Sequence, residues 1–183
     1  MKKVIVSVLG HDRPGIIAAV SAVLFEAGCN IEDVSQTILQ TEFAGVFIAS
    51  VPDDLVLDNL LTRLREKLDP MKLSVLLREM ERAGVWDEPQ SEPFVITTLG
   101  PDRPGLVAGV TELLAGFGVN ISNLKAVFRG GDAPGANIMI YEVDIPISLD
   151  QHRFREALYE RGADLGLDIS LQHRDIFEAI HRV

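Results

Sequence analysis

Residues 6–37 read VSVLGHDRPGIIAAVSAVLFEAGCNIEDVSQT, and residues 96–127 read ITTLGPDRPGLVAGVTELLAGFGVNISNLKAV. The two stretches align without a gap at an offset of 90 residues, and 12 of their 32 positions are identical. The identities include the DRPG motif, the glycine two residues before it, and a later G-x-N-I motif. A repeat at a fixed offset indicates that the chain is a tandem duplication of one supersecondary unit.

The order of elements in each copy can be predicted from hydrophobic periodicity. Short apolar runs at residues 4–9 and 94–99 predict buried strands. Apolar residues at three- and four-residue steps after each DRPG predict a helix with the proline in its first turn, ending at Gly28 or Gly118. Further strands are expected at residues 30–41, 46–51, 72–77, 120–129, 137–147 and 168–172, and second helices at residues 57–68 and 154–165.

The resulting order, β-α-β-β-α-β in each copy, predicts an α+β fold of two ferredoxin-like domains, each an antiparallel sheet with two helices on one face. The first domain is expected at residues 1–80 and the second at residues 93–173. Residues 81–92 are interpreted as a linker, because they place glycine and proline among charges, and residues 174–183 as a short C-terminal helix or tail.

Composition limits the classes of partner. The chain has 183 residues with 17 Lys and Arg against 27 Asp and Glu, so its net charge is −10. An acidic balance in both copies disfavours direct binding to nucleic acid or to an anionic membrane surface. The only cysteine, Cys29, excludes an intrachain disulfide. The apolar run at residues 4–9 is too short for a signal peptide, so a cytoplasmic location is expected.

The repeated pattern of strand, G-x-D-R-P-G, amphipathic helix and G-x-N-I resembles the ACT domain, a small regulatory module that commonly binds amino acids. The resemblance covers residues 1–79 and 93–173. Two such domains with nothing appended resemble the glycine cleavage system transcriptional repressor group. That resemblance implies a regulator that acts on a DNA-binding activator, with no direct contact to DNA, and glycine or serine as the favoured ligand.

A ligand site is expected at the DRPG loop, because the free N–H groups and the positive dipole end of a helix attract an anion such as the α-carboxylate of an amino acid. The asparagine of G-x-N-I offers an amide that can donate to a carboxylate and accept from an ammonium group. ACT ligand sites resemble this arrangement, usually completed across an interface between two domains. The candidate ligand-binding residues are Gly10, His11, Asp12, Arg13, Pro14, Gly15, Asn30, Ile31, Gly100, Asp102, Arg103, Pro104, Gly105, Asn120 and Ile121.

Each candidate also has a simpler structural role. Asp12 and Asp102 are suited to cap their helices, and this interpretation is favoured over ligand contact. Arg13 and Arg103 are candidates for a carboxylate fork, although an arginine at a helix start is more often solvated or at a subunit contact. His11 is replaced by proline in the second copy, so it can make the two sites unequal.

The sequence shows no catalytic constellation and no metal-ligand spacing, so no catalytic residue, metal or cofactor is predicted. His152, His173 and His181 are interpreted as surface histidines. Residues 129–136 contain three glycines but lack the G-K-[ST] ending of a phosphate loop, so a long hairpin loop is the better interpretation.

These observations favour a non-enzymatic, amino-acid-sensing regulatory protein that acts through contact with another protein. The alternatives are a small metabolic enzyme acting on an amino-acid-like substrate and a purely structural assembly module. A homodimer is expected, because open sheet faces and strand edges invite pairing. Apolar side chains on the open faces are expected from Val34, Gln36 and Ile38 and from residues 127–128.

Overall fold

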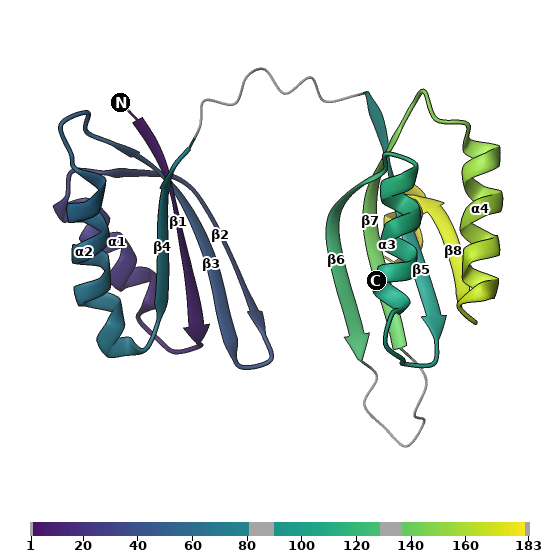
Figure 1. Ribbon diagram of the computed structural model, residues 1–183, viewed down its shortest axis with the longest axis horizontal. Helices are drawn as coiled ribbons and strands as arrows, with labels where there is room; N and C mark the ends of the chain where they lie inside the picture. Colours follow the sequence, from purple (N-terminus) through teal and green to yellow (C-terminus); the bar gives the residue numbers. More distant parts are fainter. Residues whose placement is uncertain (1, 81–89, 129–136, 182–183) are drawn as a thin grey trace. The chain divides into compact units, whose positions relative to one another are not determined.

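The structure, a computed structural model, describes residues 2–80, 90–128 and 137–181. Most of the predicted linker and the predicted hairpin loop at residues 129–136 lie outside these ranges. The chain divides into two compact units, Met1–Trp86 and Asp87–Val183 (Figure 1). Each unit is described by itself below.

Unit 1 is a four-stranded antiparallel sheet, called sheet A, with strand order β2-β3-β1-β4. Helices α1 and α2 pack together on one face of it (Figure 1). The elements are β1 (Lys2–His11), α1 (Ile16–Glu26), β2 (Asn30–Leu39), β3 (Glu42–Val51), α2 (Leu57–Leu68), the 3₁₀ turn η1 (Asp69–Met71) and β4 (Ser74–Glu79).

Unit 2 repeats this arrangement in sheet B, with strand order β6-β7-β5-β8 and helices α3 and α4. The elements are β5 (Ser91–Gly100), α3 (Leu106–Gly116), β6 (Asn120–Phe128), β7 (Asn137–Pro146), α4 (Gln151–Asp164), β8 (Asp168–His173) and α5 (Arg174–His181). Both units therefore have the βαββαβ order and the ferredoxin-like antiparallel sheet that the sequence predicts.

The core of each unit follows from the alternation of side chains along its strands. Val4, Val6 and Val8 of β1 are fully buried beneath the helices, whereas Ser7 and Leu9 point to the other face. Leu60 and Leu64 of α2 repeat at four-residue spacing and close the same core. Strand β3 begins at Glu42, four residues before the predicted start, because it pairs with β1 along its whole length.

Helix α5 covers part of the second face of sheet B. It contacts β5 and β8, and Val95, which points away from the main core, is only 2% exposed. The Arg174 guanidinium lies 3.9 Å from a carboxylate oxygen of Glu142 and 3.7 Å from one of Asp144, both on β7. Among the described residues of unit 1, no helix covers the equivalent face of sheet A.

None of the helices in the described ranges is long and apolar enough to cross a membrane.

Candidate functional site

The DRPG loops connect β1 to α1 and β5 to α3, and all their residues are exposed. Each helix begins after the motif, with Gly15 or Gly105 as its N-cap residue and no side-chain cap. The predicted capping role of Asp12 and Asp102 is therefore wrong, and the prolines precede the first turn. The reason is that the loop makes one more turn before the helix starts, which leaves the first N–H groups uncapped.

Hydrogen bonds hold each aspartate of the motif against a neighbouring strand end. The backbone N–H of Asp12 donates to the carbonyl oxygen of Thr41, in the β2–β3 turn, at 2.8 Å. In unit 2, the amide nitrogen of Asn137 donates to Asp102 Oδ1 at 3.4 Å. The Oδ1 of Asn137 is buried without a partner among the described residues, so the second loop has an acceptor available for a ligand donor.

The glycines of the motif meet two different requirements. Gly15 and Gly105 have φ angles of 97° and 92°, in the left-handed region that favours glycine. A Cβ atom on either would meet nothing within 4 Å, so the space beside the helix N-terminus is open. At Gly10 a Cβ would lie 3.0 Å from the carbonyl oxygen of Lys72, so this glycine allows close backbone approach. Gly100 does the same at 3.0 Å from the carbonyl oxygen of Gly166.

Asn30 and Asn120 are exposed at the first positions of β2 and β6. The Asn120 amide nitrogen lies 3.5 Å from Asp144 Oδ2. The isoleucines that follow, Ile31 and Ile121, are partly buried against the two cores. They therefore anchor the strand, and the asparagine amides are the groups available to a ligand.

Within one unit, the loop and the asparagine lie at opposite ends of the sheet. Asn30 pairs with Ser50, which pairs with Lys3 at the start of β1, whereas the loop follows His11 at the end of β1. Eight residues of strand span about 26 Å. A single domain therefore does not bring the N–H groups of α1 beside its own asparagine, because α1 returns the chain to the far end of the sheet before β2 begins.

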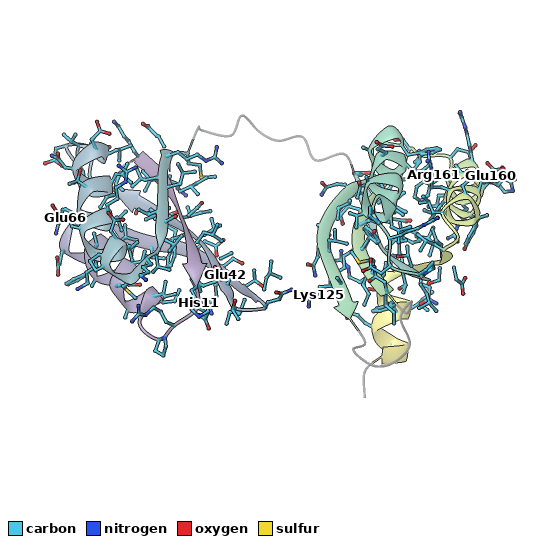
Figure 2. The ribbon with its side chains drawn as sticks, turned by 60° about the horizontal axis from the view of Figure 1, so that its bottom comes forward. His11, Glu42, Glu66, Lys125, Glu160 and Arg161 are labelled. Carbon is cyan, nitrogen blue, oxygen red and sulfur yellow. The ribbon has the colours of Figure 1, made fainter. Side chains whose placement is uncertain are left out.

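The arginines and His11 make the two loops unequal. Arg103 donates from its guanidinium to the carbonyl oxygen of Leu165, at the end of α4. Arg13 makes no hydrogen bond or ion pair with the described residues. His11 Nδ1 lies 3.4 Å from Glu42 Oε1, at the same end of sheet A (Figure 2). The first loop therefore offers an uncommitted guanidinium and an imidazole, and the second offers neither.

Strand β2 is an edge strand, and β3 is its only pairing partner among the described strands. Its register sets Val34 beside Phe47 and Ile38 beside Phe43, and both phenylalanines are buried under the helices. Val34, Gln36 and Ile38 therefore lie on the helix side of the sheet, and the prediction that they lie on the open face is wrong. Val34 and Ile38 are about half exposed, because the helices do not reach the edge. The side chains of residues 127–128 are outside the described set.

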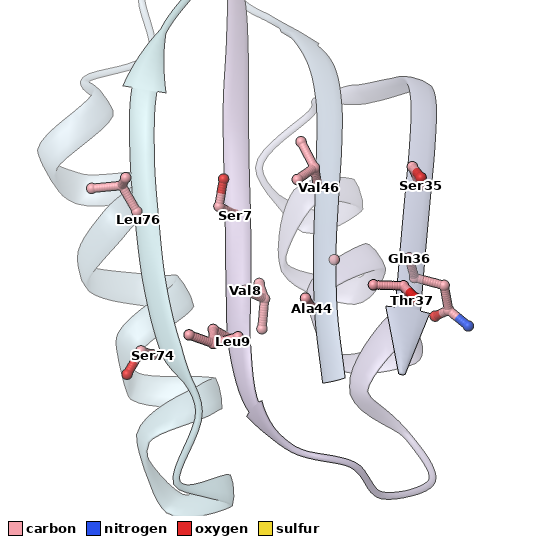
Figure 3. A pocket seen from close by; sticks show the side chains of 11 residues that line it. Ser7, Val8, Leu9, Ser35, Gln36, Thr37, Ala44, Val46, Ser74 and Leu76 are labelled. Atoms are coloured by element: carbon pink, nitrogen blue, oxygen red, sulfur yellow. The ribbon is translucent and has the colours of Figure 1, made fainter. Parts of the chain in front are cut away.

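The open face of sheet A carries a shallow apolar depression of about 490 Å³ (Figure 3). Leu9, Val46 and Leu76 project into it from three adjacent strands. Ser7 lies between Val46 and Leu76, and Ser35 and Ser74 also line the depression. Leu76 is 63% exposed. Contiguous exposed apolar surface of this kind marks sites of contact with other molecules.

The cysteine and the histidines outside the loops do not form a site with one another in the described part of the chain. No group of three or more His, Cys, Asp or Glu side chains in the described ranges could hold a metal ion. Burial raises the pKa of the Cys29 thiol, partly offset by the nearby Arg63 guanidinium. His152 is exposed, whereas His173 is 31% exposed and its ring makes a T-shaped contact with Phe94. The His181 side chain is outside the described set.

Sequence reasoning missed Thr41 and Asn137, which hold the two loops in place. Neither position belongs to the aligned stretches that define the repeat. The predicted topology could have identified Thr41, because the βαββαβ order places the β2–β3 turn beside the end of β1.

Comparison with known proteins agrees with this architecture. A UPF0237 protein of Methanopyrus kandleri is 37% identical over 90 residues, which are 49% of this chain and 96% of the relative. A solved structure of an unknown protein from Galdieria sulphuraria superposes with a TM-score of 0.75 and 25% identity, covering 94% of this chain and 98% of that one. The structure of a "putative glycine cleavage system transcriptional repressor" has the same fold, with a TM-score of 0.69, 20% identity, and coverage of 93% and 96%.

Residues 2–77 and 92–172 each match the ACT domain family. The two matches correspond to the two sheets described above and together cover most of the chain. The chain therefore belongs to the ACT domain family and carries two ACT domains in tandem.

Proposed function

We propose that this protein is a non-enzymatic regulator that binds a small amino acid at seams between ACT domains and transmits the signal through contact with another protein. The observation that carries the proposal is the separation of the uncapped helix N-terminus from the asparagine, next to a sheet edge that is unpaired within each unit. Each domain would supply two half-sites. The asparagine lies at one end of the edge strand, and the loop with the helix N-terminus lies at the other.

Edge-to-edge pairing would join the two halves. Two β2 strands related by a two-fold axis run in opposite directions, so the start of one lies beside the end of the other. The end of β2 is tied to the DRPG loop by the hydrogen bond between Asp12 and Thr41. Asn30 of one domain would then approach the loop of its neighbour. Strand β6 is the corresponding edge strand of unit 2, and Asn120 begins it.

Exposed apolar side chains beside the edge support such pairing. Val34 and Ile38 are about half exposed on the helix side of β2, and α1, which contacts β2, carries Phe25, which is 81% exposed. A second domain would remove this surface from water, which is worth about 25 cal/mol per Å². We therefore propose a homodimer of four domains.

At the seam, the free N–H groups of α1 would bind the ligand carboxylate, and the asparagine amide would accept from its ammonium group. The ligand would stabilise the paired arrangement over others and so change which surface a partner meets. The open apolar face of sheet A supports the partner-binding step. Glycine and serine are the first ligands to test, and a DNA-binding activator is the first partner to test.

The test is thermal unfolding of the full chain with each amino acid. A ligand at 100 times its dissociation constant should add about 2.7 kcal/mol of stability. Glycinamide, which lacks the carboxylate, and acetate, which lacks the ammonium group, are matched controls that should stabilise much less. Absence of a shift with every amino acid would contradict the sensing function and favour a structural assembly module.

A further inference from the structure

A groove between α3 and α4 of unit 2 has a volume of about 610 Å³. Its apolar lining comes from Leu113, Phe117 and Leu149, which are partly buried against the core of unit 2. Helix α4 contributes Arg153 and Arg161 to the lining (Arg161 is labelled in Figure 2). None of these residues belongs to the proposed amino-acid seam.

Both guanidinium groups are uncommitted. Neither makes an ion pair or a hydrogen bond with another residue in the described part of the chain. The carboxylate of Asp150, which also lines the groove, accepts from the backbone N–H groups of His152 and Arg153 at 3.0 and 3.1 Å. Glu112 supplies the other carboxylate of the lining. The groove therefore contains two guanidinium groups, which stay charged at any physiological pH. Of its two carboxylates, only that of Glu112 is not used to cap a helix.

At the equivalent position in unit 1, an ion pair bridges the two helices. Arg63 of α2 lies 3.2 Å from Glu26 of α1, so the two side chains bridge the helices. The repeat offset of 90 residues sets Gly116 at the position of Glu26. Alignment of the buried positions of α2 with those of α4 sets Ala157 at the position of Arg63. Unit 2 therefore lacks both side chains that bridge the helices in unit 1.

The same alignment shows that unit 1 has no guanidinium group at these two positions, although it keeps one cation, Lys67. Arg153 corresponds to Asn59 and Arg161 to Lys67, and Phe117 corresponds to Ala27. Two guanidinium groups and an aromatic side chain thus occur together where the bridging ion pair is missing.

We infer that this groove is a separate ligand site, which takes a small molecule with a carboxylate or phosphate group and an apolar body. Guanidinium groups bind both anions through paired N–H donors. The apolar body would lie on Leu113, Phe117 and Leu149, as in small-molecule sites that combine an apolar lining with a few polar anchors.

The test is an NMR titration of the full chain with 3-phenylpropionate, phenyl phosphate and inorganic phosphate. The two aromatic probes should shift the backbone amides of Leu113 and Phe117 and the guanidinium Nε–Hε signals of Arg153 and Arg161. Inorganic phosphate should bind more weakly, because it cannot use the apolar lining. Equal affinity for inorganic phosphate, or shifts confined to other parts of the chain, would overturn the inference. The two aromatic probes distinguish a carboxylate ligand from a phosphate ligand.

The double variant Gly116→Glu with Ala157→Arg rebuilds the ion pair of unit 1 while leaving Arg153 and Arg161 in place. A Cβ atom at position 116 would meet nothing within 4 Å, so the variant should fold. This variant should bind the aromatic probes about tenfold more weakly. The double variant Arg153→Gln with Arg161→Gln should lose about the same affinity, the loss expected when charge-assisted hydrogen bonds are removed. The control Arg155→Gln, on α4 but outside the groove, should bind like the unaltered protein. Unchanged affinity in both double variants would contradict the inference.

Discussion

The backbone N–H of Asp12 and the carbonyl oxygen of Thr41 are 2.8 Å apart, so the DRPG loop is fastened to the end of the edge strand β2. The asparagine of the same domain lies at the start of that strand. Under the function proposed above, each domain would supply two half-sites, and ligand binding would depend on a second domain.

The glycine at the helix start can be tested through stability. Gly15→Ala forces a Cβ onto a backbone with a φ of 97°, so it should destabilise unit 1 by about 1 kcal/mol even though the space beside it is open. Gly116→Ala is the matched control, because Gly116 is helical with open space around it. It should be neutral or slightly stabilising in urea unfolding. Equal effects at the two positions would refute the role assigned to the left-handed conformation.

Asn30→Ala and Asn120→Ala should weaken amino acid binding about fivefold to tenfold, the cost of losing one or two hydrogen bonds to a charged group. Both side chains are exposed, so the free energy of unfolding without ligand should change by less than about 0.5 kcal/mol. Asn59→Ala on α2 is the control. Calorimetric titration with glycine or serine measures the effect, and unaltered affinity in both variants would remove the asparagines from the site.

The edge-pairing proposal predicts the behaviour of Val34→Lys with Ile38→Lys. Two charges beside the β2 edge should disfavour pairing and shift the mass in light scattering toward the 20.1 kDa of one chain. Val56→Lys, at an exposed position before α2, should leave the mass unchanged. A mass of one chain for the unaltered protein at micromolar concentrations would contradict the homodimer.

The purified protein should not retain duplex DNA at physiological ionic strength, because its net charge of −10 opposes a phosphate backbone. The measurement is a filter-binding assay at several salt concentrations. Retention that falls steeply with added salt would show a direct electrostatic contact and would disprove this expectation.

The sequence was sufficient for the topology, because the repeat and the spacing of apolar residues identify strands β1 to β8 and helices α1 to α4. It was insufficient for the site. The asparagine and the loop are close in sequence order, but the intervening helix carries the chain to the far end of the sheet. The side of the sheet occupied by Val34 also depended on register, because the pairing is irregular between Ile31 and Asp33. A one-residue irregularity of this kind moves all later side chains to the other face.

The groove in unit 2 could not be predicted from sequence motifs, because it too depends on contacts between distant residues. Its defining change is the loss of Glu26 and Arg63, an ion pair recognisable only once α1 and α2 are seen side by side. Without knowledge of that contact, Gly116 and Ala157 do not indicate a ligand site.

In the proposed function, a ligand joins a loop from one domain to an asparagine from another. The most direct measurement is an NMR titration of the full chain with the amino acid that stabilises it. The backbone amide signals of residues 12–16 and 30–31 should shift together, with the same dissociation constant, although the two segments are about 26 Å apart within a domain. Shifts at the loop with none at residues 30–31 or 120–121 would contradict it.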